Sequence, residues 1–244
     1  MPLHFLLDEP TSARPGDAVV LGGAEAHHAA AVRRVRVGEE VTVGDGRGAW
    51  LSGVCEEVSP KEVIVRIVSR ADAAAPSPRV VLVQALAKGD RDELAVQAAT
   101  ELGIDEIVPW QAARSVSRWD PAKARKGRDR WASIVREAAK QAHRAWVPEV
   151  APLTTTTQLA SRAGESRMLV LEPSTLTALT SVQLAGGDDE VVLVVGPEGG
   201  IAPEELATLE SGGATLVRLG DSVLRTSTAG PAALAVVSAS LGRW

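Results

Sequence analysis

The chain has 244 residues, of which 45% are hydrophobic and 23% charged, enough for at least one buried core and for a division into two domains. This composition excludes a disordered or fibrous protein, and no stretch has the roughly 18 to 20 consecutive apolar residues that a membrane-spanning helix needs. The formal net charge is -5, yet residues 114–144 carry 10 basic and 3 acidic side chains. Such a local excess is expected both of a surface that binds phosphate and of a solvated helix face.

The N-terminal segment lacks the features of a secretory signal. It has no basic region and no long apolar run before Asp8, so we expect a cytoplasmic protein. Cys55 is the single cysteine, which excludes an intramolecular disulfide. Because the four histidines and this cysteine show no metal-ligand spacing, we expect no metal site.

Short strands separated by turn residues predict a small β-barrel domain over residues 1–72. Gly44–Gly48 imitates a nucleotide-binding glycine loop, but a strand rather than a helix follows it, so we interpret it as a hairpin turn. A basic cluster follows His27 and His28, and it consists of Arg33, Arg34 and Arg36. It is either a phosphate-contacting edge of the barrel or a solvated turn.

Residues 73–79, rich in Ala, Pro and Ser, predict a linker, and the pattern changes after it. From residue 80 to 244, short Val/Leu/Ile runs alternate with helical segments, which indicates an α/β domain with a parallel sheet covered on both faces. The expected strands contain VVLVQAL, IDEIVPW, MLVLEP, EVVLVVG and ATLVRLG, and a long amphipathic helix runs through Arg144. The threonines at 154–157 are expected to form a loop.

Three loops follow apolar strands of this domain, where open α/β sheets bind their ligands. They contain Leu171–Pro173, Gly196–Gly200 and Leu219–Ala229. The glycines of the second loop let the backbone approach a ligand closely, and Pro203 suits the first turn of the helix that follows. Without a Gly-Lys-Ser/Thr ending this is no P-loop; a merely tight turn is the structural alternative. The third loop also has a purely structural interpretation. In it, Arg225 simply pairs with a carboxylate, and Thr226 or Thr228 caps the helix that follows.

The sequence resembles the RsmE family of 16S ribosomal RNA methyltransferases in the SPOUT superfamily. The resemblance is carried by LEP at 171–173, VGPEGGIAPEEL at 195–206 and LGDSVLRTSTA at 219–229. Segments 27–41, 88–110 and 140–150 are also similar to family segments, so the resemblance covers nearly the whole chain.

This resemblance implies a PUA-like β-barrel followed by a SPOUT domain with a C-terminal trefoil knot. Such a knot is a rare exception to the rule that protein chains are not knotted. It also implies an S-adenosylmethionine-dependent homodimer that methylates N3 of a uridine in small-subunit ribosomal RNA. Lys140 departs from the family, many members of which carry Glu there, so no catalytic carboxylate is assigned to that position.

The resemblance and the strand-end loops together give the candidate site residues. Cofactor contacts are expected from Leu171, Glu172, Pro173, Gly196, Pro197, Glu198, Gly199, Gly200, Leu219, Gly220, Val223, Leu224, Thr226, Thr228 and Ala229. RNA contacts are expected from Arg33, Arg34, Arg36, Lys88, Arg91, Arg114, Lys123, Arg125, Lys126, Gln141 and Arg144.

Removal of the N3 proton from uracil leaves an anion that an enzyme has to stabilise. Arg225 can stabilise it or bind phosphate, whereas Glu198 either accepts a proton or holds its loop together, the role that we favour. Two alternatives to the predicted function stay open at this point. One is methylation of another RNA position, and the other is a non-catalytic RNA-binding or ribosome assembly factor.

Overall fold

The computed structural model describes residues 2–184 and 189–244, and its contacts divide the chain into two compact units. The first unit runs up to Ala75 and includes Ala139–Val147, and the second comprises Pro76–Ala138 and Pro148–Trp244. The predicted domains, 1–72 and 80–244 with a linker at 73–79, differ from this division in two respects. The two units adjoin at Ala75 and Pro76, inside the predicted linker, and Ala139–Val147 is counted with the first unit. Over the described residues, no helix combines the length and the apolarity that would let it cross a bilayer.

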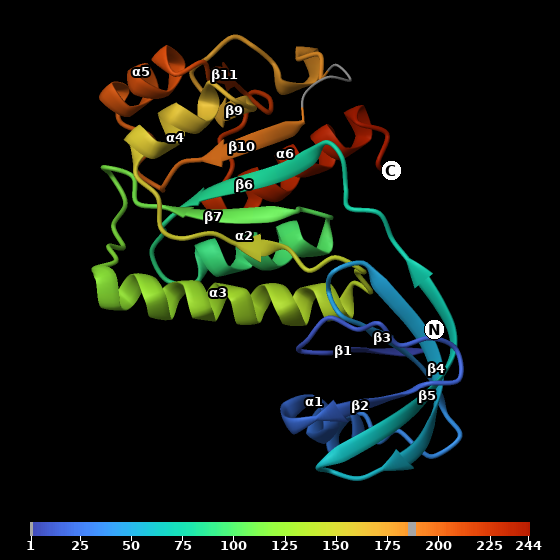
Figure 1. The fold of residues 1–244 in the computed structure, drawn as a ribbon. Helices are drawn as coiled ribbons and strands as arrows, with labels where there is room; N and C mark the ends of the chain where they lie inside the picture. Colours follow the sequence, from blue (N-terminus) through green and yellow to red (C-terminus); the bar gives the residue numbers. More distant parts are fainter. Residues whose placement is uncertain (1, 185–188) are drawn as a thin grey trace. The chain divides into compact units, whose positions relative to one another are not determined.

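The first unit is a five-stranded sheet with the strand order β1-β3-β4-β5-β2 (Figure 1). Its strands are β1 (Leu3–Leu6), β2 (Ala18–Gly22), β3 (Glu40–Gly44), β4 (Ala49–Val58) and β5 (Glu62–Asp72). Two short helical turns, α1 (Gly23–His27) and a π-helical turn (His28–Val32), follow β2. Because β1 and β2 stand at opposite ends of the strand order, the sheet is a half-barrel, which agrees with the small β-barrel domain predicted from the sequence.

The core of the half-barrel shows in the alternation of buried and exposed side chains along β5. Val63, Val65 and Ile67 are buried, whereas Arg66 and Val68 between and beyond them are exposed. The predicted hairpin turn is also confirmed, since β3 and β4 pair in antiparallel fashion across Asp45. The Asp45 carboxylate accepts the backbone N–H groups of Arg47 at 2.8 Å and Ala49 at 3.2 Å, which closes the turn without any helix.

The second unit is a six-stranded, all-parallel sheet in the order β11-β9-β10-β6-β7-β8. Its strands are β6 (Arg79–Ala85), β7 (Glu106–Trp110), β8 (Glu149–Val150), β9 (Arg167–Leu171), β10 (Glu190–Val195) and β11 (Thr215–Val217). The helices are α2 (Arg91–Glu101), α3 (Pro121–Gln141), α4 (Thr156–Ala163), a 3-10 turn (Leu179–Ser181), α5 (Pro203–Ser211) and α6 (Thr226–Ser240). The parallel α/β architecture predicted from the apolar runs is therefore confirmed.

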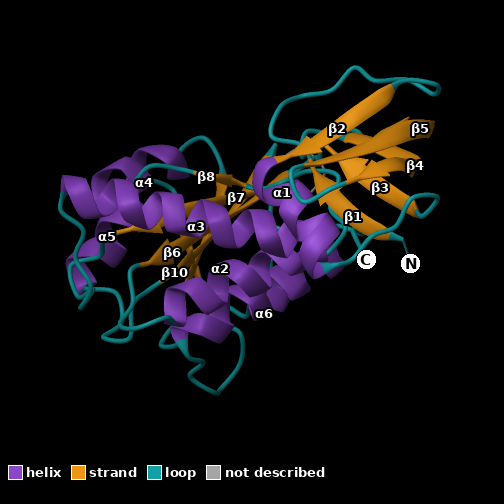
Figure 2. Cartoon of the chain, turned by 90° about the horizontal axis from the view of Figure 1, so that it is seen from below, coloured by secondary structure: helices purple, strands orange, loops and turns teal. Residues whose placement is uncertain are grey.

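Helices cover both faces of this sheet (Figures 1 and 2). On one face, Leu159 of α4 and Leu209 of α5 pack against strand residues such as Val81, Val170 and Val192. On the other face, α2 and α6 pack against each other and against β6 and β10. Both faces are apolar, which is why the strands appear in the sequence as continuous runs of Val, Leu and Ile.

Two sequence expectations about helices need correction. The threonine run at 154–157 is not a loop, because Thr155 is the N-cap of α4 and exchanges hydrogen bonds with Gln158 in a capping box. The long helix α3 ends at Gln141, before the predicted end at Arg144, and His143 just beyond it has a positive φ of 53°. Such a backbone conformation cannot continue a right-handed helix.

Candidate active site

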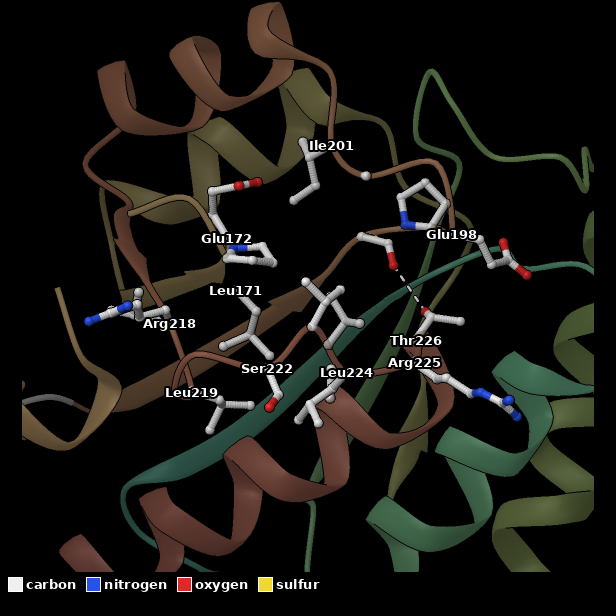
Figure 3. Close-up of a pocket in the computed structure, with 18 of the residues that line it drawn as sticks. Leu171, Glu172, Glu198, Ile201, Arg218, Leu219, Ser222, Leu224, Arg225 and Thr226 are labelled. Carbon is white, nitrogen blue, oxygen red and sulfur yellow. Dashed lines mark hydrogen bonds between the residues drawn. The ribbon is translucent and has the colours of Figure 1, made fainter. Parts of the chain in front are cut away.

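The three strand-end loops of the second unit meet at one cavity, because β9, β10 and β11 are neighbours in the sheet (Figure 3). The cavity has a volume of about 400 Å³. All of the predicted cofactor residues line it except Gly199 and Thr228. The other lining residues were not predicted as cofactor contacts; besides Arg225, they are Arg91, Val195, Ile201, Val217, Arg218 and Ser222.

The glycine loop after β10 is shaped by two of its glycines. A Cβ on Gly196 would lie 2.6 Å from Cγ1 of Ile201, so no larger residue fits there without movement. Gly200 has a φ of +72° and donates its N–H to the Pro197 carbonyl at 2.9 Å, which closes a tight turn. Gly199 is different, because its nearest neighbour would be at an ordinary 3.4 Å and the residue does not line the cavity.

The loop before α6 brings Arg225 and Thr226 to the cavity. Arg225 is the N-cap of α6 and its side chain is exposed, with no hydrogen bond or ion pair to any described residue. Thr226 does not cap the helix. Its hydroxyl donates instead to the Gly196 carbonyl at 2.9 Å, so it ties the third loop to the second (Figure 3).

Glu198 links the glycine loop to the segment between β6 and α2. Its carboxylate accepts the backbone N–H of Lys88 and one N–H of the Arg91 guanidinium, each at 3.0 Å. Partial burial pushes the pKa of Glu198 upward, but hydrogen bonds from backbone N–H groups and from Arg91 outweigh this effect and leave the pKa below its ordinary value. A carboxylate of lowered pKa that is engaged in this way is a poor proton acceptor, which favours the structural alternative for Glu198.

The loop after β9 supplies the opposite side of the cavity from Glu198 (Figure 3). Glu172 is fixed by its own turn, since its carboxylate accepts the Ser174 hydroxyl at 2.7 Å and the Ser174 N–H at 3.0 Å. Its backbone N–H donates to the Val217 carbonyl at 2.9 Å, which extends the pairing of β9 with β11. The cavity wall here is therefore held by hydrogen bonds along the main chain.

Several predicted RNA-binding side chains surround this cavity. Arg91 lines it, Lys88 is exposed on the segment that Glu198 holds, and Arg114 donates to the Gly199 carbonyl at 3.2 Å. The side chains of Lys123, Arg125 and Lys126 are exposed on the first turns of α3. Lys123 lies 3.9 Å from Asp120, whereas Arg125 and Lys126 have no partner among the described residues. This part of the basic segment therefore carries charge that the fold does not use.

The other predicted RNA contacts belong to the first unit. Arg33, Arg34 and Arg36 are exposed on the bend that follows the π-helical turn, and Arg34 has a positive φ of 57°. Gln141 is exposed at the end of α3, and Arg144 is half-buried in the segment after it. The cavity lining consists of second-unit residues and includes none of these five.

Lys140 has a structural partner. Its ammonium group lies 3.1 Å from a carboxylate oxygen of Glu25, and both side chains are nearly buried. A buried charge needs such a partner, so this lysine is part of the first unit's packing. Among the described residues, no group of His, Cys, Asp and Glu side chains could hold a metal ion.

The chain matches two family models. Residues 75–238 match the RNA methyltransferase domain, and residues 21–68 match the RNA methyltransferase PUA domain. The first match covers most of the second unit and the second covers most of the half-barrel.

Similar proteins agree with these matches. Ribosomal RNA small subunit methyltransferase E of Mycobacterium bovis is 43% identical over 94% of this chain and 89% of its own length, and that of Bacillus subtilis is 32% identical over 88% of each. The crystal structure of the same enzyme from Neisseria gonorrhoeae, bound to S-adenosyl methionine, has a TM-score of 0.87 and 28% identity over 98% of each chain. A Legionella pneumophila methyltransferase structure with bound SAM gives a TM-score of 0.88 and 30% identity, also over 98% of each chain.

Proposed function

The chain belongs to the ribosomal RNA small subunit methyltransferase E family, and from this premise we propose that it transfers a methyl group from S-adenosylmethionine to N3 of a uridine in 16S ribosomal RNA. The observation that carries the proposal is the convergence of three strand-end loops on one cavity bordered by cations. Relatives solved with the cofactor bound support it. An intact cavity of this kind argues against a non-catalytic assembly factor. A cytoplasmic location fits the proposal, because the ribosomal RNA substrate is found there.

The cavity suits the proposed cofactor in size and in chemistry. Its volume of about 400 Å³ falls in the range of small-molecule sites, and its walls are apolar at Leu171, Val195 and Val217. Gly196 and Gly200 expose main chain where a flat purine ring needs close approach. We assign the cofactor to the lining residues of the loops after β9, β10 and β11. When bound there, S-adenosylmethionine supplies an electrophilic methyl group.

The chain's own residues then have separable roles. Arg225 stabilises negative charge on the uracil ring, because its guanidinium lies at the edge of the cavity and has no partner among the described residues. Glu198 positions Arg91 and the Lys88 main chain through its two hydrogen bonds. Lys88, Arg91 and Arg114 bind phosphate or base around the target nucleotide, while Arg33, Arg34 and Arg36 of the first unit also bind RNA.

We further propose that the active form is a homodimer. Leu176 is 87% exposed and Val223 is 78% exposed, and both lie in the loops that follow β9 and β11. Large apolar side chains exposed at a functional edge are typical of a contact surface. The predicted contact over Ala229–Leu241 is less favoured, since α6 buries much of its surface against α2 and β10 of its own unit. The trefoil knot expected from the family stays a prediction.

The test is methylation of small-subunit RNA in vitro. Purified protein is incubated with methyl-labelled S-adenosylmethionine and either naked 16S RNA or 30S subunits from a strain that lacks the enzyme, and the nucleosides are then separated. We expect label in 3-methyluridine, and an Arg225→Ala protein that still binds the cofactor but methylates at least about a hundredfold more slowly. Label in another nucleoside would contradict the assignment of N3, and no label on either substrate would contradict catalysis.

A further inference from the structure

Gln84 is an unusual residue for its position in the fold. It is completely buried in β6, a central strand whose other interior residues are apolar. Its amide nitrogen donates to the Ala85 carbonyl at 3.1 Å and to the Thr226 hydroxyl at 2.9 Å, whereas its amide oxygen is buried without a hydrogen-bond partner in the described part of the chain. An unpartnered buried carbonyl destabilises a fold, so this residue is not explained by stability.

The bonds around Gln84 run in one direction, toward the glycine loop. The Gly196 carbonyl can only accept, so the Thr226 hydroxyl gives it its proton at 2.9 Å and accepts from the Gln84 amide with a lone pair. Turning the amide over would place the Gln84 oxygen against the Ala85 carbonyl oxygen. The two neighbouring groups therefore fix the orientation of the Gln84 side chain.

The end of this chain of bonds is a peptide with no other hydrogen-bonding group. Pro197 has no N–H, so the Gly196 carbonyl is the only such group on the peptide that joins Gly196 to Pro197. This peptide enters the turn closed by Gly200, and Gly196, Pro197 and Thr226 all line the cavity. Whatever orients the carbonyl orients the start of the glycine loop.

We propose that Gln84 is a positioning residue for the cofactor site: through Thr226 it holds the backbone at Gly196 in the conformation that admits the cofactor. The inference rests on the proposed function, because it takes this cavity as the S-adenosylmethionine site. It has a consequence that an ordinary core residue would not share. Replacing the amide with an apolar group of similar shape weakens cofactor binding without destabilising the fold.

The primary experiment compares Gln84→Met with the wild-type protein. Affinity for S-adenosylhomocysteine is measured by calorimetry, and thermal unfolding is followed on the same samples without ligand. We expect the dissociation constant to rise about tenfold, the effect of losing one well-placed hydrogen bond, with a midpoint of unfolding that is unchanged or higher. An unchanged affinity would overturn the proposal, and so would a loss of affinity that accompanies a lower midpoint, since that describes a merely structural residue.

A second pair of variants tests the connecting hydroxyl. Thr226→Val should weaken S-adenosylhomocysteine binding as Gln84→Met does, Thr226→Ser should restore most of it, and the double variant should lose less than the product of the two single effects. Independent effects, or no rescue by serine, would count against the chain of bonds. Thr100→Val is the matched control, because it removes the hydroxyl of another buried threonine, on α2, that does not line the cavity.

Steady-state kinetics separate positioning from catalysis. Gln84→Met should raise KM for S-adenosylmethionine and leave KM for RNA unchanged, whereas an equal rise in both would contradict the assignment. The wild-type titration keeps the two proposals apart. A wild-type protein that does not bind S-adenosylhomocysteine would refute the cofactor site itself, while normal wild-type binding with an unaffected Gln84→Met variant would refute only the role of Gln84.

Discussion

The glycines of the loop after β10 differ in how much space they leave for an added side chain. Gly196 leaves the least, so a substitution there should have the largest effect. We expect Gly196→Ala to abolish binding of S-adenosylhomocysteine, because its Cβ would lie 2.6 Å from Ile201 and would push the loop out of place. Gly199→Ala should cost far less, since the nearest atom there lies at 3.4 Å. Calorimetry on both variants checks this. Equal losses would show that the loop responds to any added methyl group.

His4 predicts how stability depends on pH. The ring is buried, stacks on Trp50 at 4.2 Å between centroids and contacts the Thr42 hydroxyl at 2.9 Å. Burial, followed by the nearby charges of His143 and Lys140, lowers the pKa of His4 to about 4. The unfolded chain, with a pKa near 6.5, then takes up a proton that the folded protein refuses, so stability falls as the pH drops from about 6.5 to about 4.

The size of this effect is at most about 3 kcal/mol, the free-energy equivalent of the difference between the two pKa values. We expect His4→Phe, which keeps an aromatic ring beside Trp50, to lose much less stability over the same pH range than the wild-type protein. Urea unfolding at pH 7, 5.5 and 4.5 measures the difference. If both proteins lose the same free energy of unfolding between pH 7 and 4.5, another group is responsible for the acid sensitivity.

At the scale of whole elements, the basic side chains of α3 fall into two groups, those with a protein partner and those exposed to solvent. Arg130 is engaged with Glu93, and Arg128 donates to the Val150 carbonyl at 2.8 Å, so both serve the fold. The side chains of Lys123, Arg125 and Lys126 on its first turns extend into solvent instead. The sequence showed the excess of charge but could not divide it in this way, because the partners lie on other elements.

This division predicts the salt dependence of RNA binding. Replacing Lys123, Arg125 and Lys126 together with Gln should reduce the slope of log affinity against log salt by about two, since fewer counterions are released when the RNA binds. Filter binding at several salt concentrations measures the slope. Affinity for S-adenosylhomocysteine should stay the same in this variant, and an unchanged slope would assign the three residues to a solvated helix face.

The helices and strands also show which parts of the fold could be predicted from the sequence and which could not. Five strands of the second unit were predicted, and β6, β7, β9 and β10 were found because their interior residues are buried on both faces and appear as an apolar run. The two-residue strand β8 was not predicted, since it has no such run. The start of α4 was missed although its signal was present, since Thr155 and Gln158 have the spacing of a capping box. Gln84 could not have been found, because its partner Thr226 lies 142 positions along the chain and only the folded sheet brings them together.

For the molecule as a whole, the sequence located the three loops of the cavity but not its full lining. Val195 and Val217 stand at the carboxyl ends of their strands, so the rule that ligands bind there would have included them. Arg218 and Ser222 are different. They belong to the loop whose path is set by hydrogen bonds between Arg218 and the segment Thr177–Leu179. No local sequence pattern predicts this pairing.

The proposed homodimer gives a prediction at this scale. Val223→Asp places a charge on a side chain that is 78% exposed in a single copy and that we assign to the contact between copies. We expect a shift from dimer to monomer in sedimentation, while the thermal midpoint of unfolding changes little. Methylation is not the readout here, because Val223 also lines the cavity. The same change at Val37, which is 66% exposed in the first unit, should leave the dimer intact. A dimeric Val223→Asp protein would place the contact elsewhere.

The first unit is built from two separate segments of the chain, and this affects how it folds during synthesis. Its last part, Ala139–Val147, is attached by several bonds: Gly48 donates its N–H to the Ala145 carbonyl, Val147 donates to Gly46, and the Trp146 indole donates to the Ala73 carbonyl. A ribosome adds these residues 64 to 72 positions after Ala75, so the half-barrel is made first and must wait for them. At about 5 to 20 residues per second, that wait lasts on the order of 4 to 14 seconds. During synthesis, the earliest part of the chain therefore completes its fold only after much of the second unit's sequence has been made.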